Sequence, residues 1–337
     1  MSFEPDPVPF VVRRPGGPDP GTPLPAVRRV GSADFGPLRS LFADPGVTDI
    51  FVNGGREVWV DRGAGLERQP AMGFIEAELR EFAVRLVALG GRHIDESNPC
   101  VDTRIHDGIR VHAVLPPISP QGTLLSIRIP HQQPLSLGDL ESAGFFDDVA
   151  SAVVRQLVAT RQNILITGAG GSGKTTLLSA ILGEAAATER IIAIEDVSEL
   201  RVQHPHFLSL EARQANLEGA GGLGLARLLR EALRMRPDRL VLGECRGAEI
   251  RELLGALNTG HDGGGGTLHA NSLADVPARL EALGALAGLG PTAIARQAVS
   301  AIGAVLHLER RHGVRRLERV GSFALDDRGR LLVVESP

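Results

Sequence analysis

The chain has 337 residues, of which 43% are hydrophobic and 23% are charged, and both fractions are ordinary for a globular protein. At this length a single core stops growing, so two domains are expected. The formal net charge of −4 argues against nucleic acid as a partner, because nucleic-acid-binding domains are usually basic. The two cysteines, Cys100 and Cys245, lie far apart in sequence, which excludes a disulfide framework and a four-cysteine zinc site.

The beginning of the chain resembles neither a secretion signal nor a folded element. It lacks the basic and apolar regions of a signal peptide, and no later run approaches the roughly 18 apolar residues of a membrane span. Residues 1–32 are rich in proline and glycine, and the prolines are too closely spaced for a helix or a paired strand. We therefore expect a disordered tail on a cytoplasmic protein that reaches the membrane only through a partner.

Residues 33–133 are expected to form a small α+β domain. Apolar residues at helical spacing predict helices around 38–42 and 75–87. Alternating apolar residues predict strands at 47–52, 56–60, 101–105, 109–115 and 123–129. The first two strands are joined through Asn53, Gly54 and Gly55, which favour the positive φ of a tight hairpin.

Residues 134–144 contain Pro134 and Gly138 and are expected to be a linker. The remainder, 145–337, is expected to be an α/β domain that begins with an amphipathic helix over 145–157. Because strands alternate with helices there, we expect a largely parallel sheet with antiparallel additions from the last three strands. The predicted strands are 163–167, 190–195, 239–243, 264–268, 304–309, 314–320 and 331–335.

A glycine-rich loop follows the first of these strands and precedes apolar residues at helical spacing. It fits the pattern G-x-x-x-x-G-K-[ST], in which backbone N–H groups surround the phosphates of a nucleotide at the positive end of a helix. A chance glycine-rich turn is the alternative, but the flanking strand and helix are the context that the motif requires. The expected nucleotide-binding residues are Gly168, Ala169, Gly170, Gly171, Ser172, Gly173, Lys174, Thr175 and Thr176.

Two side chains of this loop have specific expected roles. Lys174 is expected to reach the β- and γ-phosphates and to act in catalysis, and the Thr175 hydroxyl is expected to coordinate Mg²⁺. The ligands predicted from this loop are therefore ATP and Mg²⁺.

Carboxylates follow two of the later strands. The strand 190–195 ends in Glu195 and Asp196, and Glu195 is a candidate to polarise water or to hold the Mg²⁺ shell. A solvated acidic loop is the alternative for this stretch. Glu244 is the better candidate to orient the attacking water. Gly243 stands where an Asp is common in such a strand, which would leave Mg²⁺ coordination to Thr175 and water.

Two histidines flank a glycine-rich turn that leads into the strand 264–268. His261 and His269 are expected to lie near the γ-phosphate, where an imidazole senses the presence of charge. We expect His269 to be catalytic and His261 to bind the nucleotide. The alternative for either one is a structural histidine.

Taken together, these segments resemble the boxes of the secretion ATPases of type II and type IV secretion and type IV pili, in the same order. The matching segments are 168–176, 194–196, 234–238, 243–247, 259–263 and 267–271. Three upstream segments are similar to the tight-adherence pilus (CpaF/TadA) branch, namely 101–104, 108–111 and 125–128. The resemblance implies a PAS-like N-terminal domain before a RecA-like P-loop ATPase domain, assembled as a hexameric ring.

The same resemblance assigns roles to three arginines of the N-terminal domain. Arg104, Arg110 and Arg128 match arginines that the family brings to the nucleotide, Arg110 and Arg128 for catalysis and Arg104 for binding. A positive group that travels with a mobile domain would couple hydrolysis to movement. The alternative is that these arginines are solvated on the face of a sheet.

We therefore expect a cytoplasmic ATPase, peripheral to the inner face of the cytoplasmic membrane, that drives pilus assembly or secretion through an inner-membrane platform protein. One rival is a RecA-like nucleic-acid motor, which the acidic charge, the absence of tyrosine and the single tryptophan disfavour. A second rival is a nucleotide-switched scaffold with slow hydrolysis. An ABC-type ATPase is disfavoured because no L-S-G-G-Q-like signature occurs.

Overall fold

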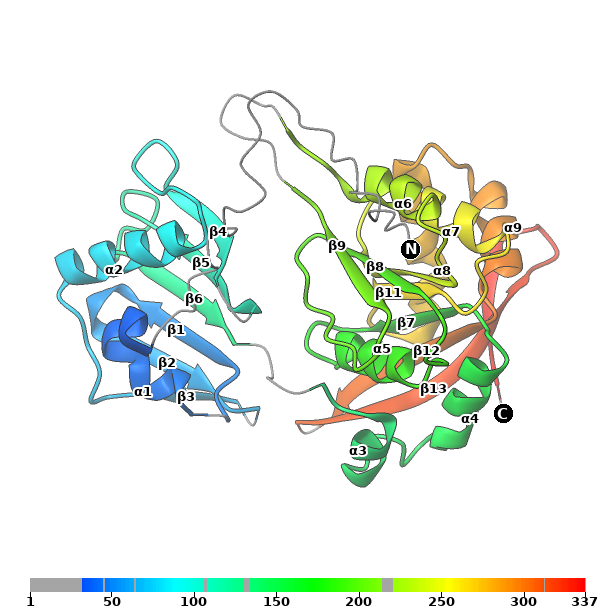
Figure 1. The fold of residues 1–337 in the computed structure, drawn as a ribbon, viewed down its shortest axis with the longest axis horizontal. Helices are drawn as coiled ribbons and strands as arrows, with labels where there is room; N and C mark the ends of the chain where they lie inside the picture. The colour runs from blue at the N-terminus through cyan, green and yellow to red at the C-terminus, as the bar shows by residue number, and fades with distance from the viewer. Residues whose placement is uncertain are drawn as a thin grey trace, which may run out of the picture.

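A computed structural model of the chain describes residues 32–44, 46–63, 65–105, 108–129, 134–213, 221–311 and 313–336. The expected tail therefore lies outside the described residues, apart from Ser32. The described residues form two sheets, one in the N-terminal part and one in the C-terminal part (Figure 1). The first sheet has one hydrophobic core, and the second has a separate core on each face. Among these residues, no helix combines the length and the apolar character that crossing a membrane requires.

The N-terminal sheet is antiparallel and its strands follow the order β3-β2-β1-β6-β5-β4. Its strands are β1 (Asp49–Asn53), β2 (Glu57–Asp61), β3 (Leu66–Arg68), β4 (Cys100–Arg104), β5 (Arg110–Val114) and β6 (Leu124–Arg128). The helical segments of this part are η1 (Ser32–Leu38), α1 (Arg39–Phe42), η2 (Gly54–Arg56) and α2 (Glu76–Leu89). Apolar residues of α2 are buried with alternate residues of the strands, so one face of the sheet forms the core.

The C-terminal sheet is mixed and follows the order β14-β13-β12-β7-β11-β10-β8-β9. The strands from β12 to β9 in this order are parallel to one another, whereas β13 and β14 are antiparallel additions. Their bounds are β7 (Ile164–Gly168), β8 (Ile191–Glu195), β9 (Phe207–Glu211), β10 (Arg239–Cys245), β11 (Gly265–His269), β12 (Ala304–Arg311), β13 (Val314–Leu325) and β14 (Leu331–Glu335).

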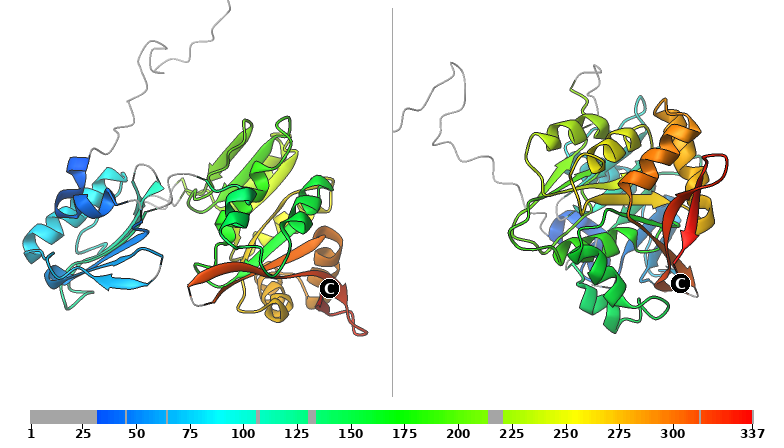
Figure 2. Two further views of the ribbon diagram at one scale, coloured as in Figure 1. Left: turned by 90° about the horizontal axis from the view of Figure 1, so that it is seen from below. Right: turned by 90° about the vertical axis from the view of Figure 1, so that its right-hand side faces the viewer.

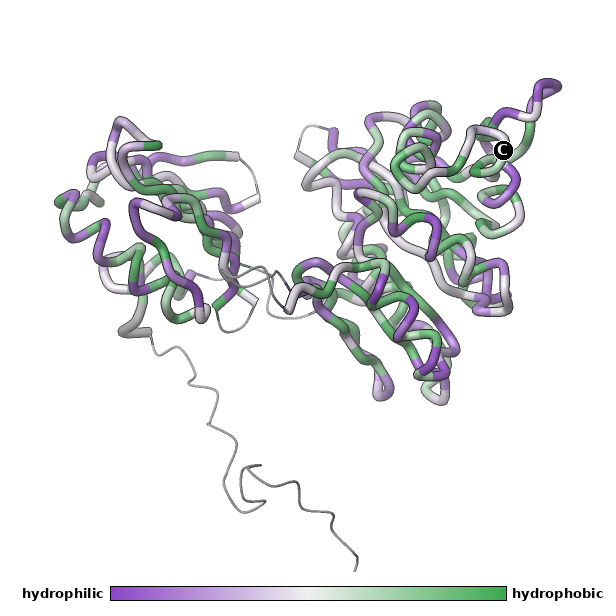
Figure 3. The backbone as a smooth tube through the Cα atoms, turned by 90° about the horizontal axis from the view of Figure 1, so that it is seen from above, coloured by the Kyte–Doolittle hydropathy of each residue, from purple (hydrophilic) through white to green (hydrophobic). Residues whose placement is uncertain are grey.

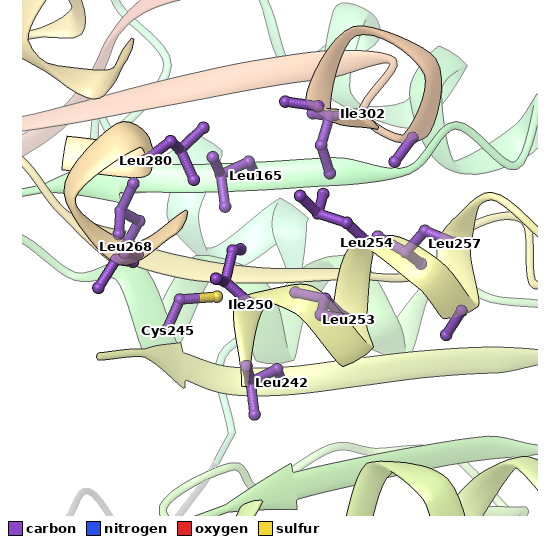
Figure 4. Packing of buried hydrophobic residues seen from close by; sticks show 14 of the residues in the cluster. Leu165, Leu242, Cys245, Ile250, Leu253, Leu254, Leu257, Leu268, Leu280 and Ile302 are labelled. Atoms are coloured by element: carbon purple, nitrogen blue, oxygen red, sulfur yellow. The ribbon is translucent and has the colours of Figure 1, made fainter. Parts of the chain in front are cut away.

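Helices cover both faces of this second sheet. They are α3 (Leu137–Ser142), α4 (Ser151–Ala159), α5 (Lys174–Gly183), α6 (Leu225–Leu233), α7 (Ile250–Leu257), η4 (Leu273–Asp275), α8 (Val276–Leu286) and α9 (Pro291–Ala301). Leu165 of β7 packs with residues of α6 to α9 (Figure 4). Its neighbour Ile166 belongs to the other core, with residues of α3 to α5. Apolar segments accordingly run through the interior of both parts (Figure 3).

The structure differs from the expectations in five elements. The predicted linker contains α3, whose capping box joins Ser136 and Asp139 and whose apolar side chains pack in the second core. The helix expected over 145–157 begins only at Ser151. The edge strands β3 and β9 had not been predicted. Finally, β12 is parallel to β7, because α9 returns the chain to the opposite end of the sheet before β12 begins.

Candidate functional site

The glycine-rich loop joins the end of β7 to the start of α5, at the edge of the sheet where the parallel strands end. Its backbone has positive φ at Gly168 (147°), Gly171 (71°) and Gly173 (99°). A Cβ atom on Gly168 would lie 2.5 Å from the carbonyl oxygen of Leu308, so a larger residue does not fit there. Gly173 directly precedes α5, and the free N–H groups of that helix therefore lie at the loop.

Lys174 is the first residue of α5, and its ammonium group turns back onto the loop. Nζ donates to the carbonyl oxygens of the first two loop residues, at 2.9 and 2.8 Å. Desolvation lowers the pKa of Lys174, and the nearby Glu244 carboxylate opposes this shift. Thr175 and Thr176 follow on the first turn of α5 and are half-buried. The loop, the lysine and the threonines thus lie together at one helix N-terminus.

Glu244 lies near the end of β10, and two side chains hold its carboxylate. Its Oε1 lies 2.9 Å from His269 Nε2, and its Oε2 lies 2.5 Å from Arg246 Nη2. His269 ends β11, opposite Gly168 of β7 in the parallel register, which places the imidazole at the loop. Desolvation and the charge of Lys174 lower the pKa of His269, although the Glu244 carboxylate opposes this shift, and the lowered pKa favours the neutral ring. A neutral ring protonated at Nε2 donates a hydrogen bond to the carboxylate.

Glu195 ends β8 and is buried, with 4% of its surface exposed. Its Oε1 accepts hydrogen bonds from the backbone N–H groups of Glu199 (2.9 Å) and Leu200 (3.0 Å). Burial raises the pKa of Glu195 to about 7, although these two hydrogen bonds oppose the shift. The alternative of a solvated acidic loop is therefore wrong for Glu195, whereas Asp196 is exposed.

Gly243 on the neighbouring strand β10 makes this burial possible. A Cβ atom at Gly243 would lie 2.6 Å from Cγ of Glu195. The side chain of Glu195 thus fills the space that a side chain at position 243 would need. Gly243 stands where an Asp is common in such strands, and here the buried carboxylate comes from β8 instead.

Two buried oxygens at these positions have no hydrogen-bond partner among the described residues. They are Oγ of Ser172 in the loop and Oε2 of Glu195. Leaving a buried polar atom unpaired costs about 1–3 kcal/mol, so each such atom needs an explanation. A ligand that brings hydrogen-bond donors or a cation to this site would satisfy them.

His261 does not lie with these groups. It follows α7 and precedes β11, and its Nδ1 lies 3.2 Å from the carbonyl oxygen of Ala256. Since β11 is parallel to β7, residues before it lie at the end of the sheet opposite the loop, and the next residue, Asp262, contacts Arg161 there. This placement contradicts the expectation that both imidazoles flank a γ-phosphate.

The three N-terminal arginines occupy facing positions on adjacent strands, with Arg110 of β5 paired to Arg104 of β4 and to Arg128 of β6. Like charges in facing positions repel each other, and here each arginine has its own carboxylate. Arg104 Nη1 lies 2.8 Å from Glu211 Oε2, Arg110 Nη1 lies 2.6 Å from Glu199 Oε1, and Arg128 Nε lies 3.0 Å from Asp49 Oδ1. Arg104 and Arg110 thus reach the C-terminal part, whereas Arg128 pairs within its own sheet.

A cleft of about 450 Å³ lies between the two parts, where Arg104 and Arg110 face the loop after β8 and the end of β9. Asp196 and Glu211 line its other side. Thr103 also lines the cleft, and its buried Oγ1 has no hydrogen-bond partner among the described residues. The structure therefore brings Arg104 and Arg110, but not Arg128, to the polypeptide next to Glu195.

Two further arginines lie at this site without a role predicted from the sequence, Arg246 and Arg315. Arg246 stands two residues after Glu244, and residues two apart in an extended chain share one face. This spacing could therefore have predicted that Arg246 lies beside Glu244. Arg315 Nε donates to the carbonyl oxygen of Gly171 at 2.9 Å, across 144 residues of sequence. No local pattern could have predicted that contact.

Comparison with protein families and with known proteins agrees with this geometry. A family model described as type II/IV secretion system protein matches residues 31–314. A candidate conjugal transfer protein of Mycobacterium tuberculosis, Rv3659c, is 46% identical over 292 residues, which cover 85% of this chain and 83% of that protein. The type IV secretion system protein VirB11 of Brucella suis is 30% identical over 274 residues, which cover 73% of this chain and 76% of that protein.

Solved structures show the same fold. The pilus retraction motor PilT with bound ADP gives a TM-score of 0.57 at 18% identity, covering 88% of this chain and 80% of that one. The ATPase DotB of Legionella pneumophila gives a TM-score of 0.55 at 20% identity, covering 88% of this chain and 78% of that one. The expected α/β fold class is thereby confirmed, with an antiparallel-sheet domain before a RecA-like domain.

Proposed function

Because the chain belongs to the family of type II/IV secretion system proteins, we propose that it is a motor that hydrolyses ATP to ADP and phosphate. The observation that carries the proposal is the Glu244 carboxylate, which His269 and Arg246 hold beside the ammonium group of Lys174. A cation for the phosphates and a positioned carboxylate for the attacking water are the two groups that this reaction needs.

Lys174 changes partners in this proposal. In the structure it is bonded to two neutral carbonyl oxygens of the loop. Phosphate oxygens carry negative charge and attract the ammonium more strongly than neutral carbonyl oxygens do, so they displace the carbonyl groups from it. Glu244 then orients the attacking water and accepts its proton, while the neutral imidazole of His269 holds the carboxylate in place.

The donor atoms present also suit a magnesium nucleotide. The Thr175 hydroxyl at the start of α5 and Oε2 of Glu195, which has no partner in the described part of the chain, are oxygen ligands of the kind that Mg²⁺ prefers. Bound Mg²⁺ would neutralise negative charge on the phosphates. Since burial raises the pKa of Glu195 to about 7, a nearby cation would also favour its ionised form.

The N-terminal arginines supply the coupling step. Arg110 is held by Glu199, and Arg104 by Glu211, in pairs that are only partly buried. Exposed ion pairs contribute at most about 1 kcal/mol, so a triphosphate can replace these carboxylates as the partner of either arginine. Arg128 needs a larger movement of the N-terminal part, because Asp49 lies on its own sheet. His261 has no role in nucleotide binding within one protomer.

We further propose that six copies assemble as a ring at the cytoplasmic face of the inner membrane, where an inner-membrane platform protein is the partner. Sequence segments 101–104, 108–111 and 125–128 support the tight-adherence pilus as the driven system. The name of the mycobacterial relative supports conjugal transfer as the second candidate. A deletion strain distinguishes the two, because it loses surface pili in the first case and DNA transfer in the second. The mass of the assembly, with and without a non-hydrolysable ATP analogue, tests the ring.

Hydrolysis is tested with two substitutions of the site. Lys174→Ala should abolish turnover and greatly weaken triphosphate binding, because it removes the only cationic side chain of the loop. Glu244→Gln keeps the shape of the side chain, so nucleotide should bind normally while phosphate release falls about 10²-fold or more. If Glu195→Gln is inactive while Glu244→Gln is not, the roles of the two carboxylates are reversed.

The two rival functions give different results in the same assay. Phosphate release close to background in the wild-type chain, despite tight nucleotide binding, would identify a nucleotide-switched scaffold. Turnover that rises on addition of DNA would identify a nucleic-acid motor.

A further inference from the structure

The hairpin formed by β12 and β13 carries an unusual number of arginines next to the phosphate loop. Most of them pair with carboxylates: Arg311 with Glu318, Arg316 with Asp147, and Arg319 with Glu335. Arg310 and Arg315 differ, because no carboxylate of the described residues lies within ion-pairing distance of either. Both guanidinium groups donate to backbone carbonyl oxygens instead.

Arg315 lies directly against the loop. Its Nε donates to the carbonyl oxygen of Gly171 at 2.9 Å, and its Cδ would lie 3.3 Å from a Cβ atom on Gly173. A guanidinium has five N–H donors in a planar fork, and only the Nε–H has an acceptor among the described residues. Both terminal NH₂ groups are therefore available beside a loop whose geometry suits phosphates.

Burial and a neighbouring positive charge both act against the charged form of Arg315. Desolvation lowers its pKa, the charge of Arg310 lowers it further, and Asp61 and Asp49 of the N-terminal part oppose the shift. Arg310 Nη2 in turn donates to the carbonyl oxygen of Gly63, at 2.8 Å, so the tip of the hairpin touches the N-terminal part. Figures 1 and 2 show β13 extending past α5 toward that part.

The position of Arg315 indicates which end of a nucleotide it would contact. Lys174 and the Glu244–His269 pair define the γ-phosphate end of the site, and His269 Cε1 would lie 3.7 Å from a Cβ atom on Gly170. Arg315 contacts the loop further along, at Gly171 and Gly173, just before the first turn of α5. Loop N–H groups and helix N-termini of this kind hold the α- and β-phosphates.

We propose that Arg315 is a nucleotide-binding residue whose terminal NH₂ groups bind the α-phosphate side of a nucleoside di- or triphosphate. This inference rests on the proposed function, since it assigns one more contact to the same nucleotide. Because ADP and ATP share the α- and β-phosphates, Arg315 contributes equally to the binding of both. In this it differs from Arg110, whose contribution depends on the γ-phosphate.

The test measures the affinity of the full chain for Mg²⁺–ADP and for a non-hydrolysable Mg²⁺–ATP analogue by titration calorimetry. Arg315→Gln should weaken both about tenfold or more, by a similar factor, because it removes a charge-assisted contact to phosphate. Arg315→Lys keeps the charge but loses the fork, so its loss should be smaller. Arg316→Gln is the matched control: successive strand residues face opposite sides, and Arg316 Nη2 pairs with Asp147 at 3.2 Å.

Salt and unfolding measurements distinguish two roles of Arg315: binding of the phosphates and stabilisation of the loop. An electrostatic contact to phosphate is screened, so the ratio between wild type and Arg315→Gln should shrink at high salt. The melting temperatures of the nucleotide-free chains should be similar. If the affinity ratio between wild type and Arg315→Gln does not change with salt, and the variant also melts at a lower temperature, the proposal is overturned. Arg315 would then only stabilise the loop.

The calorimetric titrations also distinguish failure of this inference from failure of the proposed function. Normal binding of both nucleotides by Arg315→Gln would overturn this inference and leave the proposed function intact. Weaker binding of the ATP analogue alone would place Arg315 at the γ-phosphate and overturn the assignment to the α-phosphate side. Failure of the wild-type chain to bind either nucleotide would refute the proposed function itself.

Discussion

Glu195 shows how the environment of a single residue sets its protonation. Its carboxyl is buried, and burial raises its pKa from 4.5 to about 7. Between these two values the folded state binds more protons than the unfolded state, so stability falls as pH rises. The stabilising contribution of the protonated carboxyl is thus complete below pH 4.5 and is lost as pH passes about 7.

The substitution Glu195→Gln tests this linkage. Gln cannot ionise, and its side-chain oxygen can still accept the hydrogen bonds from Glu199 and Leu200. We expect the variant to melt higher than the wild type at about pH 8, with a gap that narrows toward about pH 5. Thermal unfolding of the nucleotide-free chain at several pH values measures the gap. A gap that is constant with pH would show that Glu195 does not titrate in this range.

Gly243 gives a second prediction at the scale of one residue. A Cβ atom there would lie 2.6 Å from Cγ of Glu195, so Gly243→Ala should lower the free energy of unfolding by about 1–3 kcal/mol. Gly255→Ala is the control: Gly255 lies on the exposed face of α7, and nothing lies within 4 Å of its added methyl group. That variant should gain about 0.5–1 kcal/mol. Denaturant unfolding compares the two, and equal stability would show that Glu195 moves aside easily.

At the scale of elements, β4 and β5 deliver arginines to the loop after β8 and to β9. The Arg110–Glu199 pair joins the two parts at 2.6 Å, and an ATP γ-phosphate would compete for this guanidinium. We expect Arg110→Ala to lower steady-state turnover while ADP affinity stays nearly unchanged, because a group that acts on transferring charge contributes most in the transition state. Equal loss of ADP affinity would instead make Arg110 a general binding residue.

The elements that the sequence predicted are those with strong periodicity. β7, β8 and β10 are continuous apolar runs because both faces of their sheet are covered, and α6 buries Leu225, Leu228, Leu229 and Ala232 at helical spacing. The exposed edge strand β3 has no buried residue, so it carries no alternation that could predict it. The short helix α3 is not predicted, because the proline and glycine around it are typical of a linker. Its capping box of Ser136 and Asp139 is the local signal that favours a helix.

At the scale of the whole molecule, the N-terminal core is separate from the two cores of the C-terminal part. A fragment of residues 134–337 keeps the capped helix α3, whose Leu137 and Leu140 pack in the second part. We expect this fragment to bind nucleotide but to hydrolyse it poorly, since it lacks Arg104 and Arg110. Calorimetry and phosphate release test both statements. Wild-type turnover by the fragment would reduce the N-terminal part to a docking module.

From the sequence alone one can predict the phosphate loop, the strand before it, the carboxylates after the next strands and the order of the elements. Each of these is a local pattern, because backbone conformation and apolar periodicity depend on neighbouring residues. Three features could not be predicted in this way: the burial of Glu195 against Gly243, the position of His261 at the far end of β11, and the carboxylates that pair with the arginines. The contacts Arg110–Glu199 and Arg315–Gly171 join residues 89 and 144 positions apart, and such contacts follow from how the sheets pack.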